Sequence, residues 1–129
     1  VTDRGPGTSF VDLQFGQKQI ATIEVATGAV RVLSIFANAT HINPQYGPDG
    51  SIYFIANPEG VADIYRHNPA SGQTSRITAV RTGVAGITDM SPALSVALRS
   101  GDIAFSLFED DNYNLYALPA STPGTMRFS

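Results

Sequence analysis

The stretch that decides the fold reads Asp63-Ile64-Tyr65-Arg66-His67-Asn68-Pro69-Ala70-Ser71-Gly72-Gln73-Thr74-Ser75-Arg76-Ile77-Thr78, and two other parts of the chain resemble it. Residues 19–34 place the same apolar positions, small-residue turn and final hydroxyl 44 residues earlier, with Gly28 in the place of Gly72. Residues 114–129 form a looser copy displaced by 51 residues. The sequence thus predicts a tandem repeat, which bears on architecture more than on chemistry.

A strand is predicted upstream of the repeated stretch in each copy. Phe54 and Phe105 lie 51 residues apart in matching apolar runs, and both are expected to be buried between adjacent sheets. Phe10 precedes Phe54 by 44 residues, which predicts the equivalent strand of the first copy at residues 9–13. The three copies are expected to contribute three, four and four strands.

Turn-forming residues separate these strands. Residues 47–50 read Gly-Pro-Asp-Gly, in which proline presets φ and glycine accepts positive φ, as a hairpin connection requires. Residues 5–7 and 99–101 are predicted to be the corresponding turns of the first and third copies. No segment has a helical period over ten or more residues.

Short apolar runs that recur every 40–50 residues or so are typical of propeller blades, each of them a four-stranded sheet. The sequence therefore predicts an all-β fold: a partial β-propeller of about three four-stranded antiparallel blades, the first of them incomplete. One domain covers residues 1–129, with a partial blade at 1–42, a second blade at 43–90 and a third at 91–129. Because the chain begins at Val1, we expect a mature product or a piece of a longer protein.

Composition excludes several classes of function. The chain has 8 basic and 11 acidic residues and a formal charge of −3, which argues against a surface for nucleic acid or anionic lipid. It has no cysteine, which rules out disulfides, thiolate metal sites and cysteine catalysis. No apolar run approaches the ~18–20 residues of a membrane-spanning helix.

One longer pattern resembles a known family. Residues 44–54 read Pro-x-Tyr-Gly-Pro-Asp-Gly-Ser-Ile-Tyr-Phe and are followed by Asp-Ile-Tyr and by Ala-Ser-Gly-x-x-x-Arg-Ile-Thr, which ends at Thr78. This pattern resembles the WD-like repeats of TolB-type β-propellers. The resemblance implies a bacterial protein of the periplasm or the extracellular space that recognises a protein or another ligand through the loops at one end of its blades.

A narrower resemblance concerns residues 82–95 and 105–110. These are similar to segments of large secreted bacterial proteins that join a zincin-like peptidase domain to a TolB-like propeller. The zincin motif itself, two histidines on one helix with a glutamate between them, is absent, because His41 and His67 are far apart in the sequence.

Few side chains suggest a metal site. His41 and His67 are the only imidazoles; a metal could recruit both, but the favoured interpretation is that each ends a strand or faces solvent. Glu109, Asp110 and Asp111 offer hard oxygen ligands of the kind that Ca²⁺ prefers. They occupy the turn that corresponds to residues 57–60, where acidic side chains simply keep a loop solvated, and we favour that interpretation.

Catalytic or binding roles are weakly supported elsewhere. No serine lies in a Gly-x-Ser-x-Gly elbow, and this argues against a hydrolase nucleophile at Ser9, Ser71, Ser91 or Ser106. Asp63 and Asn114 recur at one position, which favours a structural hydrogen bond to a neighbouring turn over a carboxylate site. Asn38-Ala39-Thr40 matches the N-glycosylation pattern. The three recurring tyrosines are expected to pack the blades rather than stack on bases: Tyr53, Tyr65 and Tyr116.

The sequence thus predicts a non-catalytic recognition module without catalytic residues, metal or cofactor. Two alternatives remain open: an accessory propeller of a peptidase or polysaccharide-degrading enzyme whose catalytic residues lie outside this chain, and a structural spacer. Because a propeller needs at least about four blades to close, the terminal blades should expose apolar faces. We expect the chain to contact a partner protein or further blades, and to self-associate as a dimer.

Overall fold

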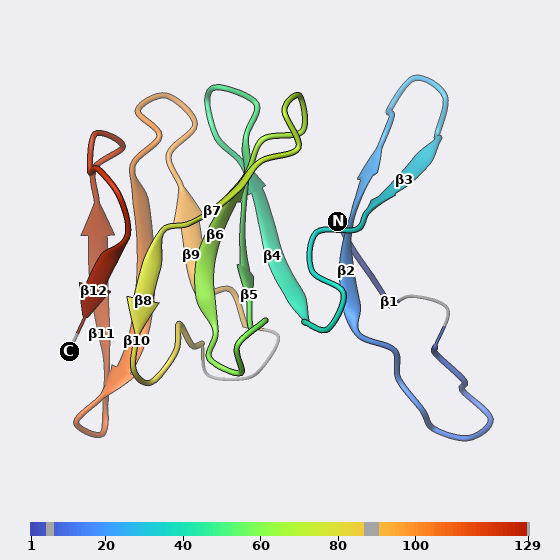
Figure 1. The fold of residues 1–129 in the computed structure, drawn as a ribbon, viewed down its shortest axis with the longest axis horizontal. Coiled ribbons are helices and arrows are strands. Elements are labelled where there is room, and N and C mark those ends of the chain that lie inside the picture. The colour runs from blue at the N-terminus through green and yellow to red at the C-terminus, as the bar shows by residue number, and fades with distance from the viewer. Residues whose placement is uncertain (5–6, 87–90, 129) are drawn as a thin grey trace.

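Short runs of β-branched and aromatic residues, separated by turns rich in Gly, Pro, Asn and Asp, build the molecule from strands. The computed structural model describes residues 1–4, 7–86 and 91–128, and these residues form twelve strands and no helix. The all-β prediction is therefore confirmed. Three antiparallel sheets stand side by side along the longest axis, and a short parallel strand pair lies at one end (Figure 1). In the described part of the chain, no helix could cross a membrane.

The central sheet is a four-stranded antiparallel meander. At its first turn the Gly47 N–H donates to the Ser51 carbonyl at 2.8 Å, and Gly50 has φ +79°, which glycine adopts without a Cβ penalty. The turn predicted at residues 47–50 is confirmed. Its first strand begins before residue 43, so the predicted boundary falls inside a strand. The four strands are β4 (His41–Tyr46), β5 (Ile52–Ala56), β6 (Asp63–His67) and β7 (Thr74–Arg76).

The C-terminal sheet has three antiparallel strands: β9 (Leu94–Val96), β10 (Ile103–Glu109) and β11 (Asn112–Leu118). In its hairpin Phe105 pairs with Tyr116, just as Phe54 pairs with Tyr65 in the β5–β6 hairpin, so both strands correspond at a displacement of 51 residues. The aromatic stacks correspond too. Ring centroids are 5.8 Å apart at 21° in the C-terminal pair and 5.9 Å apart at 22° in the central pair.

The N-terminal sheet also has three antiparallel strands: β1 (Thr2–Arg4), β2 (Lys18–Ile23) and β3 (Val30–Leu33). Its β2–β3 turn matches the β6–β7 turn 44 residues later, because Gly28 has φ +72° and Gly72 has φ +74°. The predicted turn at residues 5–7 includes Gly5 and Pro6, which lie outside the described residues.

The strand predicted at residues 9–13 is wrong. Residues 10–13 form a turn in the β1–β2 connection, and Phe10 is 77% exposed. β1 takes the expected place beside β2, where Thr2 pairs with Ile20, 18 residues later, whereas the corresponding pair in the central sheet is nine residues apart. The β1–β2 connection is therefore nine residues longer than the β5–β6 connection. A constant offset of 44 ignores this difference and aligns Phe54 with Phe10, which lies in a loop.

The fourth antiparallel strand expected in the C-terminal sheet is also wrong. β12 (Met126–Phe128) pairs in parallel with β8 (Thr78–Val80) instead (Figure 1). Beyond β7 the chain presents a free backbone edge. The Met126 N–H donates to the Ile77 carbonyl on this edge at 2.8 Å. The Phe128 ring meets Phe105 edge-on at 5.5 Å. The free edge and this aromatic contact together hold β12 away from the β11 edge.

Two apolar clusters join the three sheets. Phe54 and Phe105 are 0% and 2% exposed, which confirms that both are buried. The first cluster lies between the N-terminal and central sheets and contains Ile20, Leu33, Ile52, Phe54, Ala56 and Tyr65. The second lies between the central and C-terminal sheets and includes Ile55, Ile64, Val80, Leu94, Ile103, Phe105 and Leu107.

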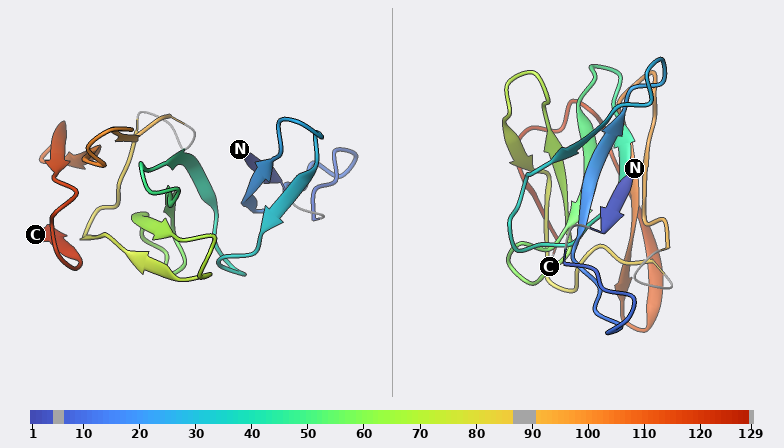
Figure 2. Two further views of the ribbon diagram at one scale, coloured as in Figure 1. Left: turned by 90° about the horizontal axis from the view of Figure 1, so that it is seen from above. Right: turned by 90° about the vertical axis from the view of Figure 1, so that its right-hand side faces the viewer.

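A bulge in β4 adds a polar link between the central and C-terminal sheets. The register of β4 shifts between Ile42 and Gln45, and Asn43 has φ +53°, so the bulge re-aims the following side chains. The Gln45 amide donates to the Leu94 carbonyl at 2.5 Å and accepts from the Val96 N–H at 3.0 Å. It thereby hydrogen-bonds to the open edge of β9. Figure 2 shows the three sheets following one another along the longest axis.

Candidate functional site

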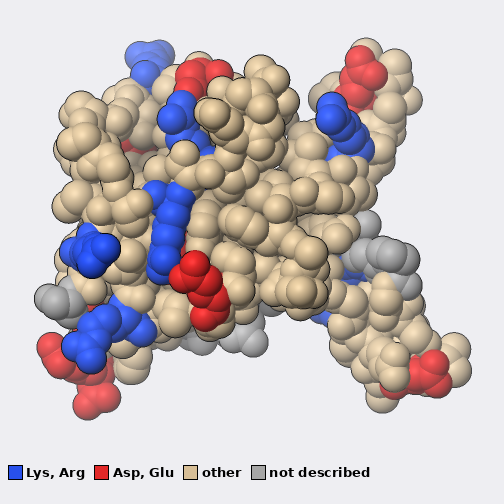
Figure 3. Space-filling view, viewed as in Figure 1, with Lys and Arg blue, Asp and Glu red and all other residues tan. Residues whose placement is uncertain are grey.

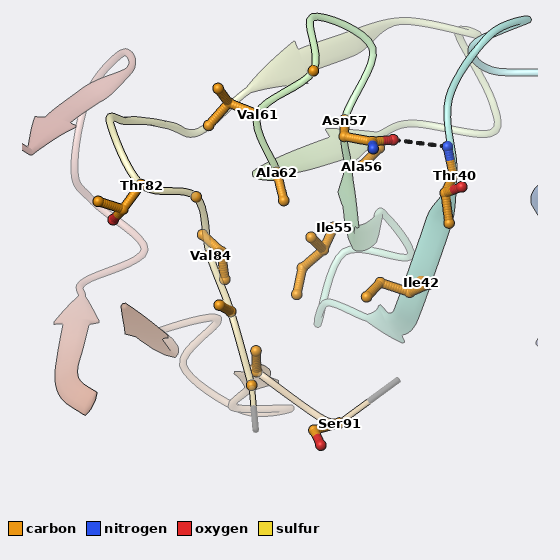
Figure 4. Close-up of a pocket in the computed structure, with 15 residues that line it drawn as sticks. Thr40, Ile42, Ile55, Ala56, Asn57, Val61, Ala62, Thr82, Val84 and Ser91 are labelled. Atoms are coloured by element: carbon orange, nitrogen blue, oxygen red, sulfur yellow. Dashed lines mark hydrogen bonds between the residues drawn. The ribbon is translucent and has the colours of Figure 1, made fainter. Parts of the chain in front are cut away.

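A pocket of about 510 Å³ opens where β5 leads into the connection at residues 57–62 (Figure 4). It lies between β4 and β5 on one side and residues 82–86 on the other. The side chains of Ile42, Ile55 and Ala62 point into it (Figure 4). The remaining lining consists of aliphatic, hydroxyl, amide and glycine residues: Thr40, Ala56, Asn57, Gly60, Val61, Thr82, Gly83, Val84, Ala85, Gly86, Ser91 and Ala93.

Hydrogen bonds between loops hold the pocket walls. The Asn57 side chain accepts from the Thr40 N–H at 2.9 Å, which fastens the start of β4 to the end of β5. Across the pocket the Val84 N–H donates to the Ala62 carbonyl at 2.7 Å. The walls of the pocket are therefore joined by one hydrogen bond to a side chain and one between backbone groups.

Gly83 permits the close approach of the two loops. Its φ is +89°, and a Cβ at this position would lie 3.3 Å from the Ala62 nitrogen. A larger residue would meet backbone atoms rather than a side chain that could rotate away. Glycine at this position is thus required by the pocket's geometry.

The chemistry of the lining is uncharged. The described lining residues include no Asp, Glu, Lys, Arg or His, and they offer hydroxyl, amide and backbone groups around an aliphatic floor. Figure 3 likewise shows positive and negative side chains interleaved over one face, with most of that face uncharged. Such a pocket suits an uncharged, partly apolar group. Residues 87–90, part of the segment that carries the narrower resemblance, lie outside the described residues.

A buried polar network lies beside the pocket and is structural. The Asp63 carboxylate is fully buried and accepts from the Thr78 hydroxyl at 2.8 Å, the Val80 N–H at 3.1 Å and Arg76 at 2.5 Å. The Thr78 hydroxyl in turn accepts from the Ile64 N–H at 3.0 Å. The hydrogen bond that Arg76 donates to Asp63 raises the pKa of Arg76. Asp63 thus makes structural hydrogen bonds, as expected, but its partners lie on β7 and β8 and not in a neighbouring turn.

Asn114 does not reproduce this network. It is exposed on β11 and donates to the Glu109 carboxylate at a long 3.4 Å. Asp63 is buried because β8 covers it, whereas no strand covers the same position of β11. The common role expected for the two residues therefore holds for Asp63 alone.

The two histidines lie far apart. His41 begins β4 opposite Ala56 and His67 ends β6 opposite Ile52, at the two ends of β5. Each histidine lies at one end of its strand, as expected. The solvent-facing alternative is wrong, because the exposed fractions are 1% for His41 and 9% for His67. Within residues 1–4, 7–86 and 91–128, no group of three or more His, Cys, Asp or Glu side chains could hold a metal ion.

The acidic turn has local partners. Asp110 and Asp111 take positive φ in the two-residue turn between β10 and β11. Glu109 accepts from the Tyr116 hydroxyl at 2.6 Å, and this bond raises the pKa of the Tyr116 phenol. These contacts stabilise the hairpin tip.

The serines considered as nucleophiles are placed separately. Ser9 donates to the Asp12 carboxylate at 2.9 Å, Ser106 donates to the Ala85 carbonyl at 2.7 Å, and Ser71 accepts from the Gln73 N–H at 3.3 Å. Ser91 alone lines the pocket. None of these hydrogen bonds is to a histidine, so among the described residues no serine–histidine pair forms at Ser9, Ser71 or Ser106.

The tyrosines pack as predicted. Tyr65 and Tyr116 stack on the phenylalanine opposite, and Tyr53 is half-buried against the second apolar cluster. Asn38 of the glycosylation pattern lies in an exposed turn. Nothing in the sequence pattern predicted the pocket, apart from the turn residues at 57–60 that form part of its rim.

Comparison with protein-family models finds none that matches this sequence, and comparison with curated proteins finds no matching relative.

Proposed function

We propose that this chain is a non-catalytic recognition module of the β-propeller type, in which the three sheets act as blades, the first of them incomplete. The identical pairing of the β5–β6 and β10–β11 hairpins supports this proposal, as does the common turn geometry at Gly28 and Gly72. The TolB-like resemblance belongs to the same proposal, and so does a periplasmic or extracellular location.

The pocket beside residues 57–62 is the single observation that carries recognition. Its volume of about 510 Å³ falls within the range of roughly 300–1,000 Å³ of ordinary ligand sites. Its aliphatic floor of Ile42, Ile55 and Ala62 favours an apolar side chain, while the surrounding hydroxyl and backbone groups suit peptide amides. We therefore propose a short, uncharged peptide segment of a partner protein as the ligand.

The proposal assigns no catalytic step to this chain. The lining supplies hydroxyl groups but, among its described members, no histidine or carboxylate that could act as a general base. An accessory role beside a catalytic domain requires the same peptide recognition and is a variant of the proposal. A spacer requires no binding at all, and the following experiment separates a spacer from a recognition module.

Selection of phage-displayed heptapeptides on the purified chain tests the proposal. Retained peptides should share an aliphatic or aromatic residue flanked by uncharged residues. Ala62→Phe should fill the pocket and weaken binding at least tenfold, because burial of one large apolar side chain contributes about 1.5–3 kcal/mol. Ala70→Phe is the matched control, since Ala70 is exposed in the turn at the opposite end of β6.

Two results would contradict the proposal. Failure to retain any peptide would favour the spacer. Equal affinities of Ala62→Phe and Ala70→Phe would mean that peptides bind away from the pocket. Circular dichroism of both variants establishes that each one is folded.

A further inference from the structure

The outer face of the C-terminal sheet is apolar and uncovered. The residues on this face are paired across β10 and β11, and three of them are large: Phe108 is 42% exposed, Tyr113 47% and Leu115 84%. The Phe108 and Tyr113 rings lie 5.0 Å apart, and the Tyr113 hydroxyl donates to the Gly86 carbonyl at 3.1 Å. The face is thus ordered by its own contacts.

The central sheet shows what covers a face of this kind. Ser106 and Leu115 correspond, at the displacement of 51 residues, to Ile55 and Ile64. Those two isoleucines are 1% and 0% exposed, because the C-terminal sheet packs on them through the side that carries Phe105. The side of the central sheet that corresponds to the outer face of the C-terminal sheet therefore packs on the sheet that comes next in the chain.

The N-terminal sheet presents the complementary free face. Its Ile20 and Leu33 side packs on the central sheet, so the opposite side faces away from the central sheet, although Ala21 on that side is only 1% exposed. That opposite side carries Ile23, Val30 and Val32, which are 49%, 62% and 41% exposed. At both internal junctions, the side of one sheet that faces toward the C-terminal end packs on the side of the next sheet that faces toward the N-terminal end. The free face of the C-terminal sheet is of the first kind, and the free face of the N-terminal sheet is of the second kind.

We propose that the outer face of the C-terminal sheet packs on the outer face of the N-terminal sheet of a second copy of this chain. If both copies contribute both faces, two identical junctions close a two-fold dimer without leaving a free face. The six side chains that would meet carry no charge, so their burial incurs no charge desolvation. This inference depends on the correspondence of the sheets and is independent of the pocket.

Sedimentation velocity across the micromolar range tests the dimer. The wild-type chain should sediment with twice the 13.7 kDa chain mass. Leu115→Glu and Val32→Glu should each be monomeric, because each buries a carboxylate in both junctions. An equimolar mixture of the two variants should recover dimers at the high end of the range, since one junction in the mixed pair is unaltered.

The control is Val11→Glu. Val11 is 94% exposed in the β1–β2 connection and belongs to no strand of either face, so its substitution should leave the dimer intact. Circular dichroism checks that each variant is folded. If Leu115→Glu loses its β-sheet signal, Leu115→Ser replaces it in the same comparison.

Several outcomes would overturn the proposal. A monomeric wild-type chain at the highest concentration would do so directly. A dimer that survives Val32→Glu and is lost in Leu115→Glu would mean that two C-terminal sheets pack on each other. Failure of the mixture to dimerise would exclude the junction between unlike faces. Masses that rise beyond two chains would indicate an open filament instead of a closed pair.

Discussion

The hairpins β5–β6 and β10–β11 share one pairing and differ in their surroundings. Phe54 and Tyr65 stack with nearly the same geometry as Phe105 and Tyr116. On the opposite side of the same strands, Ile64 is completely buried, whereas its counterpart on β11 is 84% exposed. The internal pairing of a hairpin is therefore a local property, while burial depends on which sheet packs beside it.

The comparison separates two contributions to stability. Pairing and aromatic stacking are common to both hairpins and should stabilise them alike. Each hairpin packs on at least one neighbouring sheet, but the buried network of Asp63 and a second neighbouring sheet belong to the central hairpin alone. Variants at corresponding positions can thus measure what a neighbouring sheet adds to an otherwise equivalent hairpin.

The largest effect is expected from Phe54→Ala and Phe105→Ala. Both rings are buried, and truncation of a buried phenylalanine typically costs about 3–5 kcal/mol. Phe54 should lie at the upper end, because its ring contacts Phe36 and His41 in addition to its stacked tyrosine. Urea denaturation monitored by circular dichroism measures both. Phe10→Ala is the control and should change little, since Phe10 is exposed. An unchanged midpoint for Phe105→Ala would show that its face is solvated.

The second effect contrasts Asp63→Ala with Asn114→Ala. Removal of the Asp63 carboxylate leaves the buried Val80 N–H without its acceptor, while Arg76 keeps Glu59 and the Thr78 carbonyl. A buried donor without an acceptor costs about 1–3 kcal/mol. Asn114→Ala should stay within about 0.5 kcal/mol, because the residue is exposed. Denaturation of the two variants under one condition is the measurement. Similar losses would mean that β11 is covered by something equivalent to β8.

Sequence periodicity was sufficient to predict the hairpin partners, because residues such as Phe54 and Phe105 mark the same strand in each copy. It could not locate β1, since an offset held constant at 44 does not detect a longer connection before Ile20. The parallel partner of β12 was missed because strand propensity does not specify which free edge a strand joins.

The candidate site was beyond prediction for a related reason. The pocket brings Ala62 close to Gly83, and the two residues lie in separate connections whose approach depends on sheet packing. Recurrence predicted a structural role for Asp63 and Asn114 alike, and it failed for Asn114 because it does not show which copy a neighbouring strand covers. A pocket that is not repeated leaves no such periodic signal.

The smallest effect concerns the dependence of stability on pH. It involves His41, which lies on the side of the central sheet that faces the N-terminal sheet. Its Nδ1 lies 3.0 Å from the Lys18 carbonyl and must therefore carry the proton, while Nε2 has no hydrogen-bond partner among the described residues. Burial lowers the pKa of His41 below 6.5, against the opposing effect of backbone hydrogen bonds. The pKa of His67 is lowered in the same direction by burial.

These shifts predict that acid weakens the central sheet. The unfolded chain binds protons at higher pH than the folded chain, so the free energy of unfolding should fall as the pH drops below about 6.5. The β10–β11 hairpin contains no histidine, so hydrogen exchange should show protection lost first in β2 and β4. His41→Phe should flatten the dependence of the urea midpoint on pH and leave the contribution of His67. If the wild-type chain and His41→Phe lose stability in parallel as the pH falls, His41 does not cause the loss and the titrating group lies elsewhere.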